Sequence, residues 1–234
     1  MAVAPDQPDT WYIAAASGGV WKTTNHGVTF APVFDGQSSY SIGCLALDPT
    51  NSNVVWVGTG ENNNQRSVAY GDGIYKSTDG GNSWKNMGLK ASERIGRIAV
   101  HPTQPNTVYV AAYGPVWNSG GERGIYKTTD GGETWTRILH VSDQTGFNEI
   151  HLDPRNPDVL YATAHQRRRH EWTYISGGPE SGLHISRDGG KTWTKASNGF
   201  PGGEIGRIGM SLSPVNPDVV YAAVEGSGFY RSVD

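Results

Sequence analysis

Short runs of apolar residues, separated by polar turns, recur along the whole chain. Residues 94–100, 107–112, 124–128 and 135–139 are rich in Ile, Val, Tyr and Thr, and each run has the length of a strand. Gly, Pro, Asn and Asp stand between the runs, as in turns that join strands. No stretch carries the apolar period of about 3.6 residues that marks a long helix. The pattern predicts repeated units of four strands.

The turn between the third and fourth strands of each unit carries the signature Ser/Thr-x-Asp-x-Gly-x-Thr/Ser-Trp. Full copies occupy 77–84, 128–135 and 186–193, a weaker copy occupies 23–30, and a fifth begins at residue 232. The Asp can accept backbone N–H groups, the Gly residues allow positive φ, and the Trp can pack as an apolar plug. Its oxygen ligands are too few for a calcium loop. The structural positions predicted by the signature are Asn25, Asp79, Trp84, Asp130, Trp135, Asp188, Trp193 and Asp234.

The spacing of the signature predicts the fold. Its Asp or Asn stands at 25, 79, 130, 188 and 234, at intervals of 54, 51, 58 and 46 residues. Four antiparallel strands at such a period are typical of one blade of a β-propeller. We therefore predict one all-β partial propeller over 1–234, with the last blade incomplete and the chain part of a larger ring. The predicted blades are approximately 1–35, 36–90, 91–140, 141–198 and 199–234.

The signature is similar to the Asp-box, also called the bacterial neuraminidase repeat. Residues 18–24 and 156–161 resemble segments of bacterial proteins with a sortilin-type N-terminal propeller. Such proteins are often labelled glycosyl hydrolase, and they share the repeat with xyloglucanases and sialidases. The resemblance extends over essentially the whole chain and implies an extracellular or periplasmic location. Asp-boxes occur in enzymes and in binding propellers alike, so the resemblance is more specific for fold than for activity.

Composition excludes several kinds of partner. The chain has 19 Lys and Arg against 22 Asp and Glu, a net charge of −3, and its one basic block is 167–169. Binding to nucleic acid needs a concentrated positive face, so we expect no nucleic-acid partner. No apolar run is long enough for membrane insertion. The spacing of His140, His151 and His165 does not suit zinc, and we expect neither a metal nor a cofactor.

The loops between the second and third strands are expected on the face opposite the Asp-boxes. They are long in units two to four, at 60–72, 113–123 and 165–180, and we call their surface the long-loop face. They mix amides, carboxylates, Arg and aromatic residues, which suits carbohydrate or peptide recognition. The candidate ligand-binding residues are Glu61, Arg66, Arg97, Trp117, Glu149, Arg167, Arg169, Trp172 and Arg207.

Each of these candidates also has a structural interpretation. Trp117 and Trp172 can equally pin long loops to the scaffold. Arg97, Glu149 and Arg207 occupy equivalent positions in the first strands, where charged residues commonly pair between blades.

Two functions follow from these features. The first is a non-catalytic propeller that binds protein or carbohydrate through the loops of blades two to four, favoured by the sortilin-type resemblance. The alternative is a xyloglucanase- or sialidase-like glycoside hydrolase, which needs two carboxylates across the sugar. Glu61, Asp72 and Glu171 are its candidate catalytic residues. The expected partners are a polysaccharide or other glycan, or a peptide, and the remainder of the chain's own propeller.

An open arc of blades leaves unpaired strand edges, which are prone to association. We therefore expect the isolated chain to self-associate or to be partly unfolded. Sedimentation and thermal melting test this expectation. A monomer with one cooperative melt would indicate a closed five-bladed ring instead.

Overall fold

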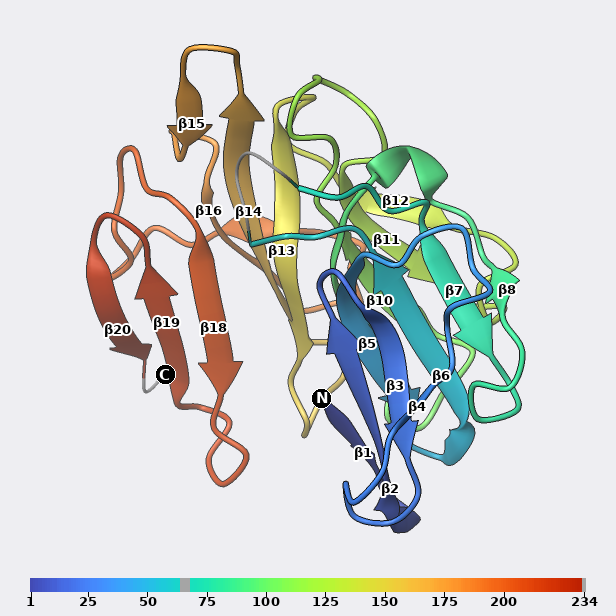
Figure 1. Cartoon of the computed structure of the whole chain (residues 1–234). Helices are drawn as coiled ribbons and strands as arrows, with labels where there is room; N and C mark the ends of the chain where they lie inside the picture. Colours follow the sequence, from blue (N-terminus) through green and yellow to red (C-terminus); the bar gives the residue numbers. More distant parts are fainter. Residues whose placement is uncertain (64–67, 233–234) are drawn as a thin grey trace.

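A computed structural model describes residues 1–63 and 68–232 of the chain. Five antiparallel sheets follow one another along the sequence and stand side by side in a curved series (Figure 1). The helical structure described is one three-residue 3-10 turn, η1 (Lys90–Ser92). The predicted all-β propeller architecture is confirmed. Arg66 and Asp234, named from the sequence as ligand-binding and Asp-box residues, lie outside the described residues.

The first three sheets have four strands each, paired in sequence order. The first sheet consists of β1 (Ala2–Ala4), β2 (Gln7–Ala15), β3 (Gly19–Thr23) and β4 (Ala31–Pro32). The second consists of β5 (Ile42–Asp48), β6 (Asn51–Thr59), β7 (Ile74–Ser77) and β8 (Lys85–Asn86). The third consists of β9 (Ile95–Val100), β10 (Val108–Ala112), β11 (Gly124–Thr128) and β12 (Thr136–Leu139).

The last two sheets depart from the four-stranded pattern. The fourth consists of β13 (Thr145–Leu152), β14 (Leu160–Arg169), β15 (Tyr174–Ser176), β16 (Gly182–Ser186) and β17 (Thr194–Lys195). The fifth consists of β18 (Ile208–Leu212), β19 (Val220–Val224) and β20 (Gly228–Ser232). Part of the segment expected as a loop after residue 164 is a hairpin, because β14 continues to Arg169 and pairs with β15. This pairing satisfies the backbone N–H and C=O groups of both segments, which need hydrogen-bond partners.

Apolar side chains fill the spaces between successive sheets. Between the first and second sheets the buried residues include Tyr12, Val20, Phe34 and Val55. Between the second and third they include Trp56, Ile74, Ile98 and Val110. Between the third and fourth they include Tyr109, Ile125, Phe147 and Leu160. Each of the first four sheets is thus held to its neighbour by burial of apolar surface.

The Asp-box turns are closed by the Asp carboxylate. In the third sheet, Oδ1 of Asp130 accepts the Thr128 hydroxyl at 2.6 Å and the Thr134 N–H at 3.0 Å. The Thr128 hydroxyl oxygen accepts the Gly132 N–H at 3.0 Å. Asp79 and Asp188 make the same contacts in their own turns. These bonds stabilise the ionised form, so they hold the pKa of Asp79 at about 2 and lower those of Asp130 and Asp188 further.

The glycine that follows the Asp of each full Asp-box accepts hydrogen bonds from the preceding sheet. The Gly80 carbonyl accepts the Tyr12 hydroxyl at 3.0 Å and the Lys22 ammonium at 2.8 Å, both from the first sheet. Lys76 donates to the Gly131 carbonyl at 2.9 Å and Lys127 to the Gly189 carbonyl at 3.0 Å. The Asp-box glycine carbonyls of the second, third and fourth sheets therefore each accept a hydrogen bond from a lysine of the preceding sheet.

The signature tryptophans add contacts between sheets in two of the three full copies. The Trp84 indole N–H donates to the Val33 carbonyl at 2.7 Å, and that of Trp135 donates to the Met87 carbonyl at 2.8 Å. Both acceptors follow the last strand of the preceding sheet. Trp193 instead donates within its own turn, to the Gly190 carbonyl at 3.2 Å.

The Asp-box carboxylates predict a loss of stability in acid. Their pKa values in the folded chain lie below the ordinary 3.8, so their stabilisation is complete above that value and is lost as the pH falls toward 2. Thermal melting between about pH 2 and pH 7 should show this fall in Tm. The triple variant Asp79→Asn/Asp130→Asn/Asp188→Asn should have a lower Tm at neutral pH and a flatter acid limb. Asp35→Asn, at an exposed carboxylate, is the control and should keep the wild-type acid limb.

Candidate functional site

Four segments converge on the long-loop face, which lies at the top of Figure 1, where the β14–β15 hairpin projects. Arg167 on β14 donates through Nη1 to the Asn62 carbonyl at 3.1 Å. Arg207, just before β18, donates through Nη1 to Oδ1 of Asn63 at 2.7 Å. Tyr113, just after β10, forms a hydrogen bond with His165 on β14. Residues from the second to the fifth sheets therefore meet at one place.

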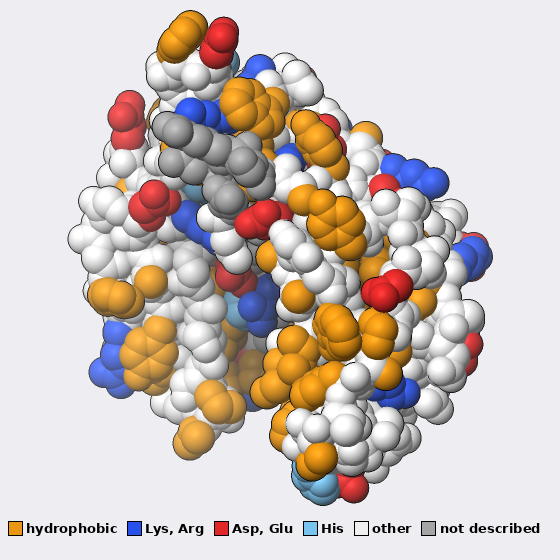
Figure 2. Space-filling view, in the orientation of Figure 1, with side chains coloured by type: hydrophobic (Ala, Val, Ile, Leu, Met, Phe, Trp, Pro, Cys, Tyr) orange, Lys and Arg blue, Asp and Glu red, His pale blue; other side chains and the backbone are white. Residues whose placement is uncertain are grey.

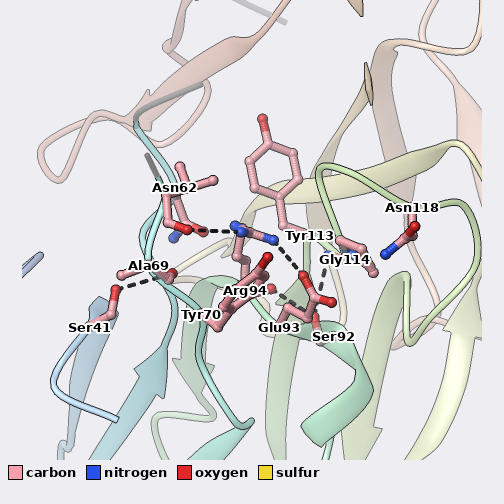
Figure 3. Close-up of polar contacts among 12 residues, drawn as sticks. Ser41, Asn62, Ala69, Tyr70, Ser92, Glu93, Arg94, Tyr113, Gly114 and Asn118 are labelled. Atoms are coloured by element: carbon pink, nitrogen blue, oxygen red, sulfur yellow. Dashed lines mark hydrogen bonds and ion pairs between the residues drawn. The ribbon is translucent and has the colours of Figure 1, made fainter. Parts of the chain in front are cut away.

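A buried arginine organises the part of this face near the second and third sheets. Arg94 is fully buried and donates to Oε2 of Glu93 at 2.8 Å and to the Val68 carbonyl at 3.4 Å. Figure 3 shows its side chain extending between Asn62 and Glu93. Its guanidinium lies 5.4 Å from the centre of the Tyr70 ring. Burial lowers the pKa of Arg94, and the Glu93 carboxylate opposes that shift.

Glu93 itself has an unusual backbone. Its φ is 59°, in the left-handed region that non-glycine residues seldom adopt. Its carbonyl accepts the Gly71 N–H at 2.8 Å, and its carboxylate is bound by Arg94. Such strain persists where the surroundings enforce it, which occurs often at functional sites.

A chain of hydrogen bonds crosses the fourth sheet and reaches the fifth. Nδ1 of His165 contacts the Tyr113 hydroxyl, and Nε2 lies 3.4 Å from the Ser176 hydroxyl oxygen. Ser176 donates to the Glu225 carboxylate at 3.1 Å. Because Ser176 has one proton to donate, its oxygen must accept from Nε2–H, which leaves Nδ1 to accept from Tyr113. Ser176 is therefore not activated as a nucleophile, since His165 carries its proton on the nitrogen that faces it.

Both ring side chains in this chain of bonds are uncharged at neutral pH. Burial lowers the pKa of His165 to about 3, and the charges of Arg167 and Arg207 act in the same direction. Burial raises the pKa of Tyr113. A neutral imidazole with a single tautomer fixes the direction of every bond in the chain.

Two arginines of the β14–β15 hairpin lie against aromatic rings of the hairpin and of the loop after β10. Arg167 donates through Nε to the Tyr174 hydroxyl at 3.0 Å, and its guanidinium lies 5.1 Å from the centre of the Tyr113 ring. The Arg169 guanidinium lies 5.9 Å from the rings of Trp117 and Tyr174. Cation–π contacts of this kind hold aromatic rings in fixed orientations.

Large aromatic surfaces remain exposed near these contacts. Trp172, at the hairpin tip, is 86% exposed, Tyr70 is 63% exposed and Trp117 is 38% exposed. Figure 2 shows apolar, acidic and basic side chains gathered around a hollow in this side of the molecule. Trp172 is therefore not used to pin its loop to the scaffold, whereas Trp117 is partly covered.

The three candidate catalytic carboxylates have different surroundings. Glu61 is half-buried, and its backbone N–H donates to the Ala69 carbonyl at 3.2 Å. Asp72 accepts the Tyr75 hydroxyl at 2.5 Å, so its carboxylate has a local structural bond. Glu171 is exposed next to Trp172.

The equivalent charged residues of the inner strands form contacts between sheets. Arg97 pairs with Glu149 at 3.0 Å, and Glu149 also contacts Nε2 of His151 at 3.1 Å. Burial raises the pKa of Glu149, but the bonds from His151 and Arg97 outweigh burial and lower it. Arg97 and Glu149 thus form an ion pair between the third and fourth sheets.

Several residues of the site were missed as candidates in the sequence. Glu93 and Arg94 form a charged pair at the start of an apolar inner strand, which is a signal that could have identified them. Ser176 and Glu225 carry no such signal, and Glu225 precedes a very short loop that drew no attention.

No helix in the described part of the chain is long and apolar enough to cross a bilayer. Residues 1–63 and 68–232 contain no group of three or more His, Cys, Asp and Glu arranged to hold a metal ion.

Comparison with known proteins gives one family and a set of enzymes. A family model, Sortilin-Vps10, described as sortilin, neurotensin receptor 3, matches residues 72–198. A xyloglucanase from a Paenibacillus species is 25% identical over 228 residues, which are 86% of this chain and 21% of that protein. The xyloglucanase of Hypocrea jecorina is 27% identical over 218 residues, 83% of this chain and 25% of that protein.

A solved structure supports the fold. The GH74 enzyme from Niastella koreensis superposes with a TM-score of 0.70 at 24% identity, covering 100% of this chain and 36% of that chain. The chain spans between 8% and 29% of the length of the curated relatives that it matches.

The hydrogen-bond chain predicts that His165 stays neutral in mild acid. With a pKa of about 3, its imidazole should keep the Nε2–H tautomer from about pH 8 to pH 4. Long-range proton–nitrogen NMR spectra report the tautomer and the titration directly. Arg207→Gln should raise the pKa of His165, because it removes a nearby positive charge. A wild-type midpoint near the ordinary value of 6.5 would contradict the assignment.

Proposed function

This chain belongs to the Sortilin-Vps10 family, and we propose that its long-loop face binds a xyloglucan-type polysaccharide as part of a glycoside hydrolase. The observation that carries the proposal is the set of exposed aromatic rings on the long-loop face, together with a polar pocket on that face that Arg167 and Arg207 line. Flat aromatic faces pack on the apolar faces of sugar rings, while amides and arginines bind hydroxyl groups. Similarity to xyloglucanases over most of the chain supports this substrate class.

The aromatic rings are held in position before any ligand binds. Tyr70 rests against the buried Arg94 guanidinium, and Trp117 lies against Arg169. Each ring is therefore supported on one side by a cation and is still partly exposed. A preorganised surface loses less conformational entropy on binding, which favours affinity for an extended ligand.

Hydrolysis requires carboxylates in two protonation states. One acts as general acid, and the other acts as base or nucleophile in its ionised form. Of the three carboxylates named from the sequence, Asp72 has a structural bond to Tyr75. We therefore take Glu61 and Glu171 as the main candidates. Glu93 is a further candidate, because its ion pair with Arg94 holds the carboxylate in position. We propose hydrolysis for the whole protein and glycan binding for the long-loop face of this chain.

The binding proposal predicts losses at the exposed aromatics. Trp172→Ala and Tyr70→Ala should each weaken affinity for a xyloglucan oligosaccharide by about fivefold, from the lost stacking of about 1 kcal/mol. Isothermal titration calorimetry measures the change. Phe30→Ala is the matched control, since Phe30 is 37% exposed and lies in the first Asp-box copy. Unchanged affinity in both test variants, or binding of peptides but no glycan, would contradict the proposal.

The catalytic proposal predicts a loss of turnover without a loss of binding. Glu61→Gln or Glu171→Gln should lower kcat on xyloglucan by about a hundredfold or more if the residue transfers the proton. Glu133→Gln, at a carboxylate paired with Lys85 beside an Asp-box, is the control. Asp72→Asn should chiefly lower Tm, because its carboxylate binds Tyr75. Normal turnover in both glutamate variants would remove them as catalytic residues.

A further inference from the structure

A small cavity lies where the four segments of the long-loop face meet. Its volume is about 300 Å³, and its lining includes Asn63, His165, Arg167, Ser176, Arg207 and Glu225. Pockets for small ligands have volumes of roughly 300–1,000 Å³, so this one lies at the lower limit. The size suits a single sugar residue or side group better than the backbone of a polysaccharide.

The charged groups that line the cavity do not cancel. Arg167 and Arg207 contribute two positive charges and Glu225 one negative charge, so the sum is 2 − 1 = +1. His165 adds none, because burial and the two arginines keep it neutral. Two nearby ion pairs, Arg94–Glu93 and Arg97–Glu149, each cancel internally and leave this sum unchanged.

The hydrogen bonds leave the charge of Arg207 in place. Its guanidinium donates to the neutral amide oxygen of Asn63 at 2.7 Å. Glu225 accepts the backbone N–H of Arg207 at 3.0 Å and the Ser176 hydroxyl at 3.1 Å, both of which are neutral donors. Among residues 1–63 and 68–232, no ion pair joins the Arg207 guanidinium to a carboxylate. The half-buried cation therefore faces the cavity without direct neutralisation.

We propose that this cavity binds the carboxylate of an acidic sugar, a uronate residue carried by the glycan on the long-loop face. A planar carboxylate matches the fork of a guanidinium group, and a single negative charge balances the cavity's sum. A phosphate dianion would leave an excess negative charge next to Glu225. Asn63, Ser176 and the Tyr174 ring provide contacts for the hydroxyls and apolar face of the sugar. This inference rests on the proposed glycan-binding function.

The test compares two forms of one ligand on the full chain. One is an oligosaccharide with a single glucuronate residue, and the other is the same oligosaccharide with that carboxylate reduced to an alcohol. Calorimetry at low salt should show about tenfold tighter binding of the acid form, as expected for a charge-assisted hydrogen bond. Added salt should reduce the difference, because it screens the charges.

Two variants that change the charge of the cavity in opposite directions give a second test. Arg207→Gln should abolish the preference for the acid form, whereas Glu225→Gln should increase it, because the cavity then loses its one negative charge. Arg187→Gln, at an exposed arginine in an Asp-box, removes the same charge elsewhere and should leave the preference unchanged. If Arg207→Gln lowers Tm too far for titration, the gain expected of Glu225→Gln still decides the question.

The outcomes separate this inference from the function on which it rests. Equal binding of the acid and reduced forms overturns the uronate site, while binding of neutral xyloglucan oligosaccharides judges the proposed function independently. Tighter binding of a peptide with a free C-terminal carboxylate than of its amide, with no preference between the sugars, also overturns the uronate assignment. Loss of the preference in the Arg187→Gln control would show that the effect is not local, and it would overturn the inference as well.

Discussion

The hydrogen bonds to the Asp-box glycine carbonyls fix the second, third and fourth sheets, each relative to the one before it. The Asp carboxylate closes the turn, and the closed turn presents its carbonyl to a lysine of the preceding sheet, as with Lys76 and Gly131. Each such bond joins residues 55 or more positions apart in the sequence. The convergence of the loops of the second to fourth sheets at the other end depends on these bonds, because a rotation of one of these sheets would separate the loops.

Buried arginines have the corresponding role at the opposite end. Irregular backbone needs partners for its carbonyl groups once it is buried. Arg123 donates to the carbonyls of Gly120 at 3.0 Å, Tyr113 at 2.9 Å and Asn118 at 3.0 Å, which holds the long loop of the third sheet in shape. Burial lowers the pKa of Arg123 to about 10, which still leaves it charged at neutral pH. Arg167, which is also a binding candidate, has the same structural role, because it donates to the Asn62 carbonyl.

Local features of the fold could be predicted from the sequence, and contacts between distant segments could not. The strands at 107–112 and 124–128 follow from residues within them, and the structure has β10 and β11 there. The lysine bonds were missed, although Lys22, Lys76 and Lys127 recur immediately before the signature. Glu225 was missed because its importance arises from Ser176 and Arg207 in other elements. Which loop side chains face inward is a property of the assembled sheets.

The bonds from Tyr113 through His165 and Ser176 to Glu225 all run one way. Reversing any of them requires reversing the rest, since a neutral imidazole has only one N–H to offer. In the lining of the cavity the Glu225 carboxylate is therefore the acceptor at the end of this chain of bonds, and the neighbouring Arg207 guanidinium is a donor. Such a cavity distinguishes the donor end of a guest from its acceptor end, so a guest that carries both fits it in one orientation.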